Sequence, residues 1–139
     1  MKYKNLEKIK ALIADDEGNN RLCLSFVLEQ EGWEVSQAQD GRETIEKVLK
    51  WRPDLLILDN QMPELTGVEV YKLLQLYGIK LAIVLISANS ELEEIASSLG
   101  IPYYLQKPFD IAEFITKTNS AYENYLNQKL LVYEDISHN

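Results

Sequence analysis

The sequence predicts a single α/β domain in which a doubly wound parallel sheet lies between two layers of helices. Five short apolar runs alternate along the chain with longer segments of helical periodicity. Two of these runs, Leu-Leu-Ile-Leu at 55–58 and Leu-Ala-Ile-Val-Leu-Ile at 81–86, do not alternate with polar residues, which indicates strands covered on both faces. The chain has 139 residues, 46% of them hydrophobic, which suits one compact domain.

The apolar runs are the strand candidates, and they lie at residues 11–14, 35–38, 55–58, 81–86 and 103–105. A helical segment follows each run, and repetition of this unit with right-handed crossovers produces a parallel sheet. We therefore expect the fold class α/β, with a doubly wound (βα)5 sheet of the flavodoxin-like type and strand order 2-1-3-4-5.

Helix starts and ends can be located from local motifs. Four capping boxes are present, at Asp40-x-x-Glu43, Thr66-x-x-Glu69, Ser90-x-x-Glu93 and Asp110-x-x-Glu113. The first four helices are expected to stop at Gly32, Pro53, Gly78 and Gly100, the last of these with Pro102 close behind it.

The apolar pattern of the fifth helix can continue beyond residue 119. Tyr122, Tyr125, Leu126 and Leu130 carry this pattern, whereas residues 134–139 are polar and are expected to fray. We expect a domain over residues 9–122 and a C-terminal helix extension and tail over residues 123–139.

Composition narrows the range of partners and compartments. The formal net charge is −8, so we expect this segment to bind neither nucleic acid nor anionic membranes. One cysteine and one histidine leave no internal disulfide and no zinc cluster. The N-terminus lacks the apolar stretch of a signal peptide, and no apolar run approaches the roughly 20 residues of a membrane span. These features predict a cytoplasmic protein.

Chemically active side chains follow four of the predicted strands. Asp15 and Asp16 follow the first strand, Asp59 the third, Ser87 the fourth and Lys107 the fifth. Because the carboxyl ends of parallel strands meet at one edge, we expect these side chains to lie together. Clustered carboxylates favour a hard cation with oxygen ligands, and Mg²⁺ suits a site of few carboxylates with waters and a phosphate oxygen. The set predicts a carboxylate nucleophile for phosphoryl transfer.

Four stretches of sequence resemble the receiver domain of two-component response regulators, over about residues 10–122. They are Ala14-Asp15-Asp16-Glu17 with Asn20-Arg21, Leu58-Asp59-Asn60-Gln61-Met62-Pro63 with Gly67, Ile86-Ser87-Ala88, and Tyr104-Leu105-Gln106-Lys107-Pro108-Phe109. The resemblance implies a single-domain regulator of the chemotaxis type, a phosphoprotein that takes part in a phosphorelay. It implies a phosphoacceptor switch with intrinsic Mg²⁺-dependent autophosphorylation and autodephosphorylation, and not an enzyme in the ordinary sense.

The resemblance assigns the metal and acceptor residues. It implies that Asp59 takes the phosphoryl group, as an aspartyl phosphate, from a histidine kinase or a histidine phosphotransfer domain. It implies that Asp16 and Asp59 bind Mg²⁺ directly, that Asp15 acts mainly through metal-bound water, and that the backbone carbonyl of Gln61 completes the protein ligands.

The resemblance also assigns the switch. Lys107 and Ser87 would bind the phosphoryl group, and Tyr104 would turn inward from an exposed position as Ser87 moves, so that the binding of an unknown downstream protein changes. A cis bond between Lys107 and Pro108 is implied as well. Ser87 stands where threonine is commoner, and Ile101-Pro102-Tyr103 departs from the usual sequence before the last strand, at the surface through which many receivers dimerise.

Three rival functions differ in chemistry. A pseudo-receiver would keep the fold without phosphorylation, but every site residue is present. A phosphatase of the haloacid-dehalogenase type needs a general acid two residues after its nucleophile, where this chain has Gln61. A flavodoxin-like flavin carrier needs phosphate donors where this chain has Asp15 and Asp16.

The first helix has more apolar residues than one buried face requires. Part of this surface is expected to face outward, and two interpretations stay open. The helix either has a wide core face or uses the edge formed by Leu22 and Phe26 to dock a helical partner. Cys23 lies in the same arc and is expected to pack.

Overall fold

The computed structural model describes residues 8–138, except for the side chains of residues 133, 134 and 136–138. Its strands are β1 Lys10–Ala14, β2 Glu34–Ala38, β3 Leu55–Asp59, β4 Ala82–Ser87 and β5 Tyr104–Gln106. Its helices are α1 Gly18–Gln30, α2 Gly41–Trp51, α3 Gly67–Leu76, α4 Leu92–Leu99 and α5 Ile111–His138. Every predicted strand is present, with bounds within about one residue of the expected ones.

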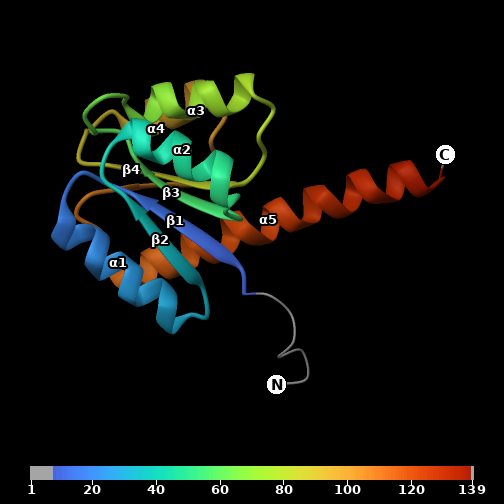
Figure 1. The fold of residues 1–139 in the computed structure, drawn as a ribbon, viewed down its shortest axis with the longest axis horizontal. Coiled ribbons are helices and arrows are strands. Elements are labelled where there is room, and N and C mark those ends of the chain that lie inside the picture. The colour runs from blue at the N-terminus through green and yellow to red at the C-terminus, as the bar shows by residue number, and fades with distance from the viewer. Residues whose placement is uncertain (1–7, 139) are drawn as a thin grey trace.

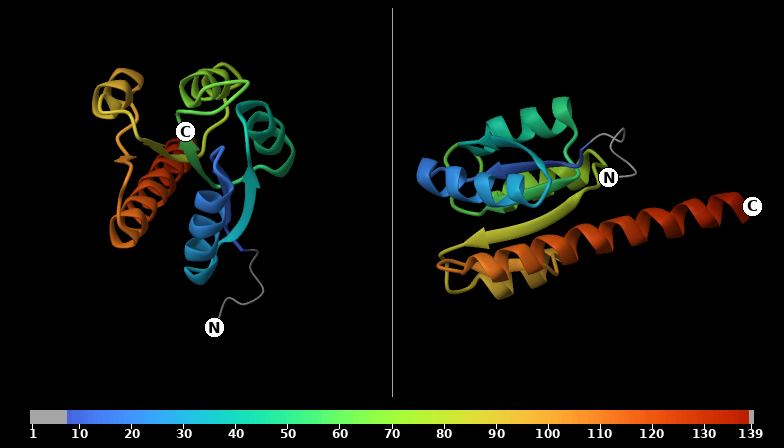
Figure 2. Two further views of the ribbon diagram at one scale, coloured as in Figure 1. Left: turned by 90° about the vertical axis from the view of Figure 1, so that its left-hand side faces the viewer. Right: turned by 90° about the horizontal axis from the view of Figure 1, so that it is seen from below.

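The five strands form one parallel sheet in the order β2-β1-β3-β4-β5. Helices α1 and α5 cover one face, and α2, α3 and α4 cover the other (Figures 1 and 2). This is the doubly wound, flavodoxin-like arrangement that the sequence predicts, and it confirms the fold class.

The central strand β3 shows why its sequence does not alternate with polar residues. Leu55 and Ile57 lie in the core under α1 and α5, whereas Leu56 and Leu58 lie in the core under the other three helices. All four side chains are fully buried. Since successive residues of a strand point to opposite faces, a strand between two helical layers must be apolar throughout.

Three of the four predicted helix starts are confirmed. Thr66 and Glu69 form a complete capping box, and Asp40 and Asp110 each accept the backbone N–H three residues ahead. These bonds satisfy N–H groups that have no partner within the helix.

The predicted start of α4 at Ser90 is wrong. The helix begins at Leu92, after an N-cap residue, Glu91, whose side chain makes no capping bond. Asn89 accepts the N–H of Glu91 (2.8 Å), and its own N–H is bound by Ser87 Oγ (3.1 Å). This local turn competes with the helix and delays its first residue.

Helix α5 is a continuous element of 28 residues that projects beyond the sheet (Figures 1 and 2). Leu130, Leu131 and Val132 are exposed on the projecting part. The backbone is helical through the stretch expected to fray, up to His138, and Asn139 lies outside the described residues. Among the described residues, no helix is both long enough and apolar enough to span a bilayer.

Candidate functional site

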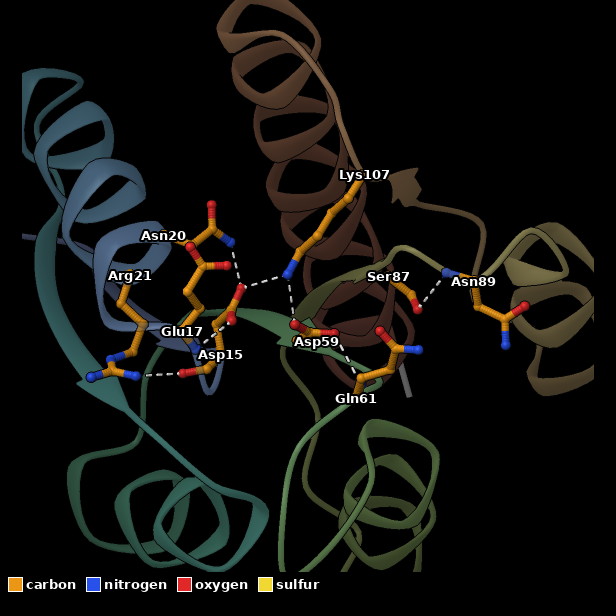
Figure 3. A network of polar contacts seen from close by, with 9 residues as sticks. All are labelled: Asp15, Glu17, Asn20, Arg21, Asp59, Gln61, Ser87, Asn89 and Lys107. Carbon is orange, nitrogen blue, oxygen red and sulfur yellow. Dashed lines mark hydrogen bonds and ion pairs between the residues drawn. The ribbon is translucent and has the colours of Figure 1, made fainter.

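The carboxyl edge of the sheet brings together side chains from four separate parts of the chain. Asp59 ends β3, Ser87 ends β4, Asp15 follows β1 and Lys107 follows β5 (Figure 3). Asp15 and Ser87 are fully buried and Asp59 is 2% exposed, so water covers these polar groups only slightly. The sequence-based expectation that they share one edge is confirmed.

Lys107 joins the two buried carboxylates. Its Nζ atom lies 2.7 Å from Oδ2 of Asp59 and 2.9 Å from Oδ2 of Asp15. One ammonium therefore serves two carboxylates in a site of low water access, where charge interactions are stronger than on the surface. The pair of carboxylates and the lysine together carry a negative charge.

Backbone N–H groups fix the other oxygen of each carboxylate. The N–H of Gln61 donates to Oδ1 of Asp59 at 2.9 Å, and the N–H of Glu17 donates to Oδ1 of Asp15 at 2.9 Å. Each bond spans two residues and closes a tight turn directly after a strand. The strand ends thus orient both carboxylates toward Lys107.

The acidities of the cluster follow from burial and from these contacts. Burial raises the pKa of Asp59, and this exceeds the lowering by the hydrogen bonds from Lys107 and Gln61. Burial acts on Asp15 in the same sense, but the hydrogen bonds from the N–H of Glu17, from Lys107 and from Asn20 lower its pKa overall. Burial alone would lower the pKa of Lys107, yet its pairing with the two carboxylates raises it, so the lysine stays charged.

A third carboxylate stands at the mouth of the cluster. Asp16 is exposed. One carboxylate oxygen from each of Asp15, Asp16 and Asp59 lies within 4.8 Å of the other two. Carboxylate oxygens are the donors that Mg²⁺ prefers, and one ammonium does not balance three carboxylates. The donor set therefore fits a hard dication.

The hydroxyl of Ser87 lies on the fourth strand with its oxygen engaged by Asn89. Ser87 Oγ accepts the N–H of Asn89 at 3.1 Å (Figure 3), and the carbonyl of Ser87 accepts the N–H of Lys107 at 2.8 Å. The backbones of the hydroxyl and lysine residues are thus tied to each other across β4 and β5. The peptide bond after the lysine, Lys107-Pro108, is cis, as the sequence resemblance implies.

Tyr104 is not in the fully exposed position expected from the sequence. It is half-buried and packs against the core under α2, α3 and α4, with the ammonium of Lys117 5.8 Å from its ring centroid. A cation over an aromatic face is attractive, so Lys117 of α5 adds to the core packing that holds this side chain.

Asn20 and Arg21 belong to the receiver-like stretch of sequence, but the resemblance assigns neither of them a role. In the structure Asn20 Nδ2 donates to Oδ2 of Asp15, and Arg21 donates through Nη1 to the backbone carbonyl of Asp15 at 2.7 Å. Arg21 Nε also donates to Oε1 of Gln37 at 3.2 Å. Both residues lie in the first turn of α1, directly after the acidic loop. This closeness in sequence to Asp15 is the feature that could have predicted their contacts with it.

Gly67 packs against the backbone that carries Asp59. A Cβ atom at Gly67 would lie 2.6 Å from the carbonyl oxygen of Asp59 and 2.8 Å from Cα of Asn60, which is closer than real Cβ atoms come. We expect Gly67→Ala to lower the free energy of unfolding by about 1–3 kcal/mol, because the loop must shift. Urea denaturation checks this, with the exposed Lys72→Ala in α3 as the control. Equal stability of the two variants would contradict it.

The fold and this cluster define a class of doubly wound α/β domains that carry carboxylates, a lysine and a hydroxyl at the carboxyl edge of the sheet. Residues 11–119 match the family described as response regulator receiver domain. The chain belongs to the response regulator receiver family. Receiver domains are phosphoacceptor switches of two-component signal transduction; they bind Mg²⁺ at an acidic cluster and interact with histidine kinases or phosphotransfer proteins.

Curated relatives support the assignment. Sporulation initiation phosphotransferase F of Bacillus subtilis is 34% identical over 122 residues, which are 86% of this chain and 95% of that protein. Response regulator MprA of Mycolicibacterium vanbaalenii is 35% identical over 111 residues, 78% of this chain. The alkaline phosphatase synthesis transcriptional regulatory protein PhoP of Bacillus subtilis is 35% identical over 106 residues, 75% of this chain. The match spans 48% of MprA and 44% of PhoP, about half of each regulator.

Solved structures agree. The receiver domain of the Francisella response regulator 1452 superposes with a TM-score of 0.77 at 29% identity, over 84% of this chain and 98% of that chain. The chemotaxis protein CheY4 of Vibrio cholerae superposes with a TM-score of 0.75 at 28% identity, over 83% of this chain and 99% of that chain.

Proposed function

We propose that Asp59 is the phosphoacceptor of this receiver and that it takes a phosphoryl group in the presence of Mg²⁺. The observation that carries the proposal is the contact of buried Asp59 with Lys107, beside two further carboxylates. The N–H of Gln61 and the ammonium of Lys107 hold the carboxylate of Asp59 in one orientation at the end of the central strand β3. Such a group is positioned for attack on a phosphorus atom, where positioning and charge neutralisation dominate catalysis.

In the proposed step an oxygen of Asp59 attacks the phosphorus of a phosphohistidine or an acyl phosphate. The new oxygen–phosphorus bond forms while the bond from phosphorus to the leaving group breaks, and the leaving group keeps the bonding electrons. Lys107 then turns from the carboxylate of Asp59 to an oxygen of the phosphoryl group. The ammonium is close enough to do so without a change in the backbone, since its Nζ already lies 2.7 Å from the acceptor.

In the proposed metal site, the oxygens of Asp16 and Asp59 and the carbonyl of Gln61 would hold Mg²⁺, with Asp15 acting mainly through water. The ion, when bound, neutralises charge that develops on the phosphoryl oxygens. The exposed position of Asp16 at the mouth supports its role as a direct ligand, whereas the oxygens of Asp15 already accept three donors.

The test is labelling by a small phosphodonor. We propose intrinsic autophosphorylation and autodephosphorylation, so purified protein with acetyl phosphate and Mg²⁺ should gain the mass of one phosphoryl group. The gain should disappear with EDTA, and it should decay after removal of the donor. Absence of labelling at saturating Mg²⁺ would contradict the proposal and would favour a receiver fold without phosphorylation.

We expect Asp16→Ala to weaken Mg²⁺ binding by about tenfold or more, because one of few protein oxygens is lost. The side chain is exposed, so the fold should persist. Calorimetric titration with Mg²⁺ measures the affinity, and Glu17→Ala is the matched control, since it removes an exposed carboxylate next door and keeps the N–H that binds Asp15. Equal affinities in the two variants would place the metal elsewhere.

The partner surface that we propose is the exposed edge of α1. Leu22 and Phe26 are 65% and 64% exposed there and lie one helical turn apart, which suits the apolar face of a helical kinase or phosphotransfer bundle.

Cys23 is exposed beside them and does not pack in the core, contrary to the sequence-based expectation. Cys23 lies among the apolar residues of α1, which is why it was expected to be buried, but the helix buries only Leu24, Ser25 and Leu28.

We propose that the receiver ends near residue 122 and that residues 123–139 form an extension. Its support is that Ala121 is the last buried core residue of α5; Tyr122 and Tyr125 pack only partly against the core, and the helix then passes beyond the sheet. We also propose that the protein acts in the cytoplasm, in keeping with its single cysteine.

A further inference from the structure

Asp15 is surrounded by donors that come from different elements. Its Oδ1 atom accepts the N–H of Glu17 at 2.9 Å. Its Oδ2 atom accepts two donors, the ammonium of Lys107 at 2.9 Å and the side-chain amide of Asn20 (Figure 3). Because Asp15 is fully buried, an oxygen that lost its donors would remain without water and would cost free energy.

The two donors to Oδ2 differ in whether they also donate to another acceptor. Lys107 is shared with Asp59, where the phosphoryl group is expected to attach, and a phosphoryl oxygen would compete for the ammonium. Asn20 has no second acceptor among the described contacts and sits in the first turn of α1. Arg21, the next residue, ties that turn to the carbonyl of Asp15. The amide is therefore the donor that can stay when the lysine leaves.

We propose that Asn20 is a positioning residue of the metal site, which holds the carboxylate of Asp15 toward the cation after Lys107 has turned to the phosphoryl group. The inference rests on the proposed function, because it assumes that a cation and a phosphoryl group both reach this cluster. Asn20 itself touches neither. It acts through Asp15, as hydrogen-bond partners behind metal ligands commonly do.

The amide favours cation binding by keeping one orientation of Asp15 populated. Without it, Oδ2 of Asp15 depends on Lys107 alone, and the metal-bound water must then compete with the lysine for the same oxygen. Loss of such a supporting bond commonly lowers metal affinity by about 10- to 100-fold. For Asn20 we expect about tenfold, since the N–H of Glu17 and the Arg21 contact still restrain Asp15.

The test compares Asn20→Leu, which is nearly the same size and cannot donate, with Asn19→Leu at the preceding, exposed position. Mg²⁺ is titrated into each protein and the backbone amide resonances of Glu17 and Gln61 are followed by NMR, without any phosphodonor. Asn20→Leu should bind Mg²⁺ about tenfold more weakly than wild type, and Asn19→Leu should bind within about twofold of it. Equal affinity of Asn20→Leu and wild type overturns the inference.

A second readout uses the wild-type protein and does not depend on the folding of a variant. The side-chain amide resonances of Asn20 should be displaced from those of a solvent-exposed asparagine, and they should stay displaced at saturating Mg²⁺ and beryllofluoride. Their return to the exposed values in either state overturns the inference, because the amide would then have left Asp15. Acetyl phosphate labelling of the wild type, measured separately, decides the proposed function, so the two failures are distinguishable.

Discussion

Asp59→Asn is expected to abolish labelling by acetyl phosphate, with no labelling above background at saturating Mg²⁺. An amide oxygen is a poor nucleophile, and the substitution also removes an anionic metal ligand. Intact-mass measurement after incubation with the donor checks the result. Glu64→Gln, in the exposed loop after β3, makes the same chemical change outside the cluster and should be labelled as fully as wild type.

The same variant tests whether loss of labelling reflects lost chemistry or lost structure. Burial raises the pKa of Asp59, so a neutral amide at this position removes a desolvation cost and leaves Lys107 paired with Asp15. We therefore expect Asp59→Asn to unfold at a urea concentration no lower than wild type. Full labelling of the variant would exclude Asp59 as the acceptor, and an unfolded variant would contradict the electrostatic argument.

Much of the fold could be predicted because its determinants are local. The unbroken apolar runs at β3 and β4 locate strands covered on both faces, and the box of Thr66 and Glu69 locates the start of α3. The same kind of motif failed at Ser90, where the turn at Asn89 takes precedence. A capping box gives a helix start only where no stronger local hydrogen bond competes for the same backbone groups.

The site could be predicted to the extent that strand ends define it. Asp15, Asp59, Ser87 and Lys107 each follow or end a strand, and parallel topology alone brings them to one edge. The contact from Asn20 could not be predicted in this way, because it depends on how α1 leaves the loop. The half-buried state of Tyr104 likewise depends on its packing against the core under α2, α3 and α4, which the local sequence around β5 does not reveal.

The position of Ser87 in the unphosphorylated protein indicates where a signal would begin. Its Oγ accepts the N–H of Asn89, so the hydroxyl faces the loop before α4. An aspartyl phosphate adds about two negative charges and three strong acceptors at Asp59. The hydroxyl of Ser87 and the ammonium of Lys107 are donors at the same edge. We expect Ser87 to move toward the phosphoryl group and to release the N–H of Asn89.

Release of Asn89 would change the packing around the fourth helix. The half-buried Tyr104 already packs against the core that includes Leu92 and Ala96 of α4, so a modest rotation can carry its ring further inward. Lys117 would then lose its position over the ring. Because a ligand shifts only an equilibrium between existing states, the unphosphorylated protein should already visit the inward state as a minor population.

Beryllofluoride, a mimic of the acyl phosphate, is expected to shift NMR resonances in two regions at saturating Mg²⁺. One region surrounds Asp59 and Lys107, where the mimic binds, and the other surrounds Asn89, Tyr104 and the side chain of Lys117. In Ser87→Ala the first set of changes should persist and the second should be largely lost, because the hydroxyl that links the two regions is absent. If the changes in wild type stay within the Asp59 pocket, or if Ser87→Ala shows both sets in full, the link through Ser87 is wrong even with Asp59 as the acceptor.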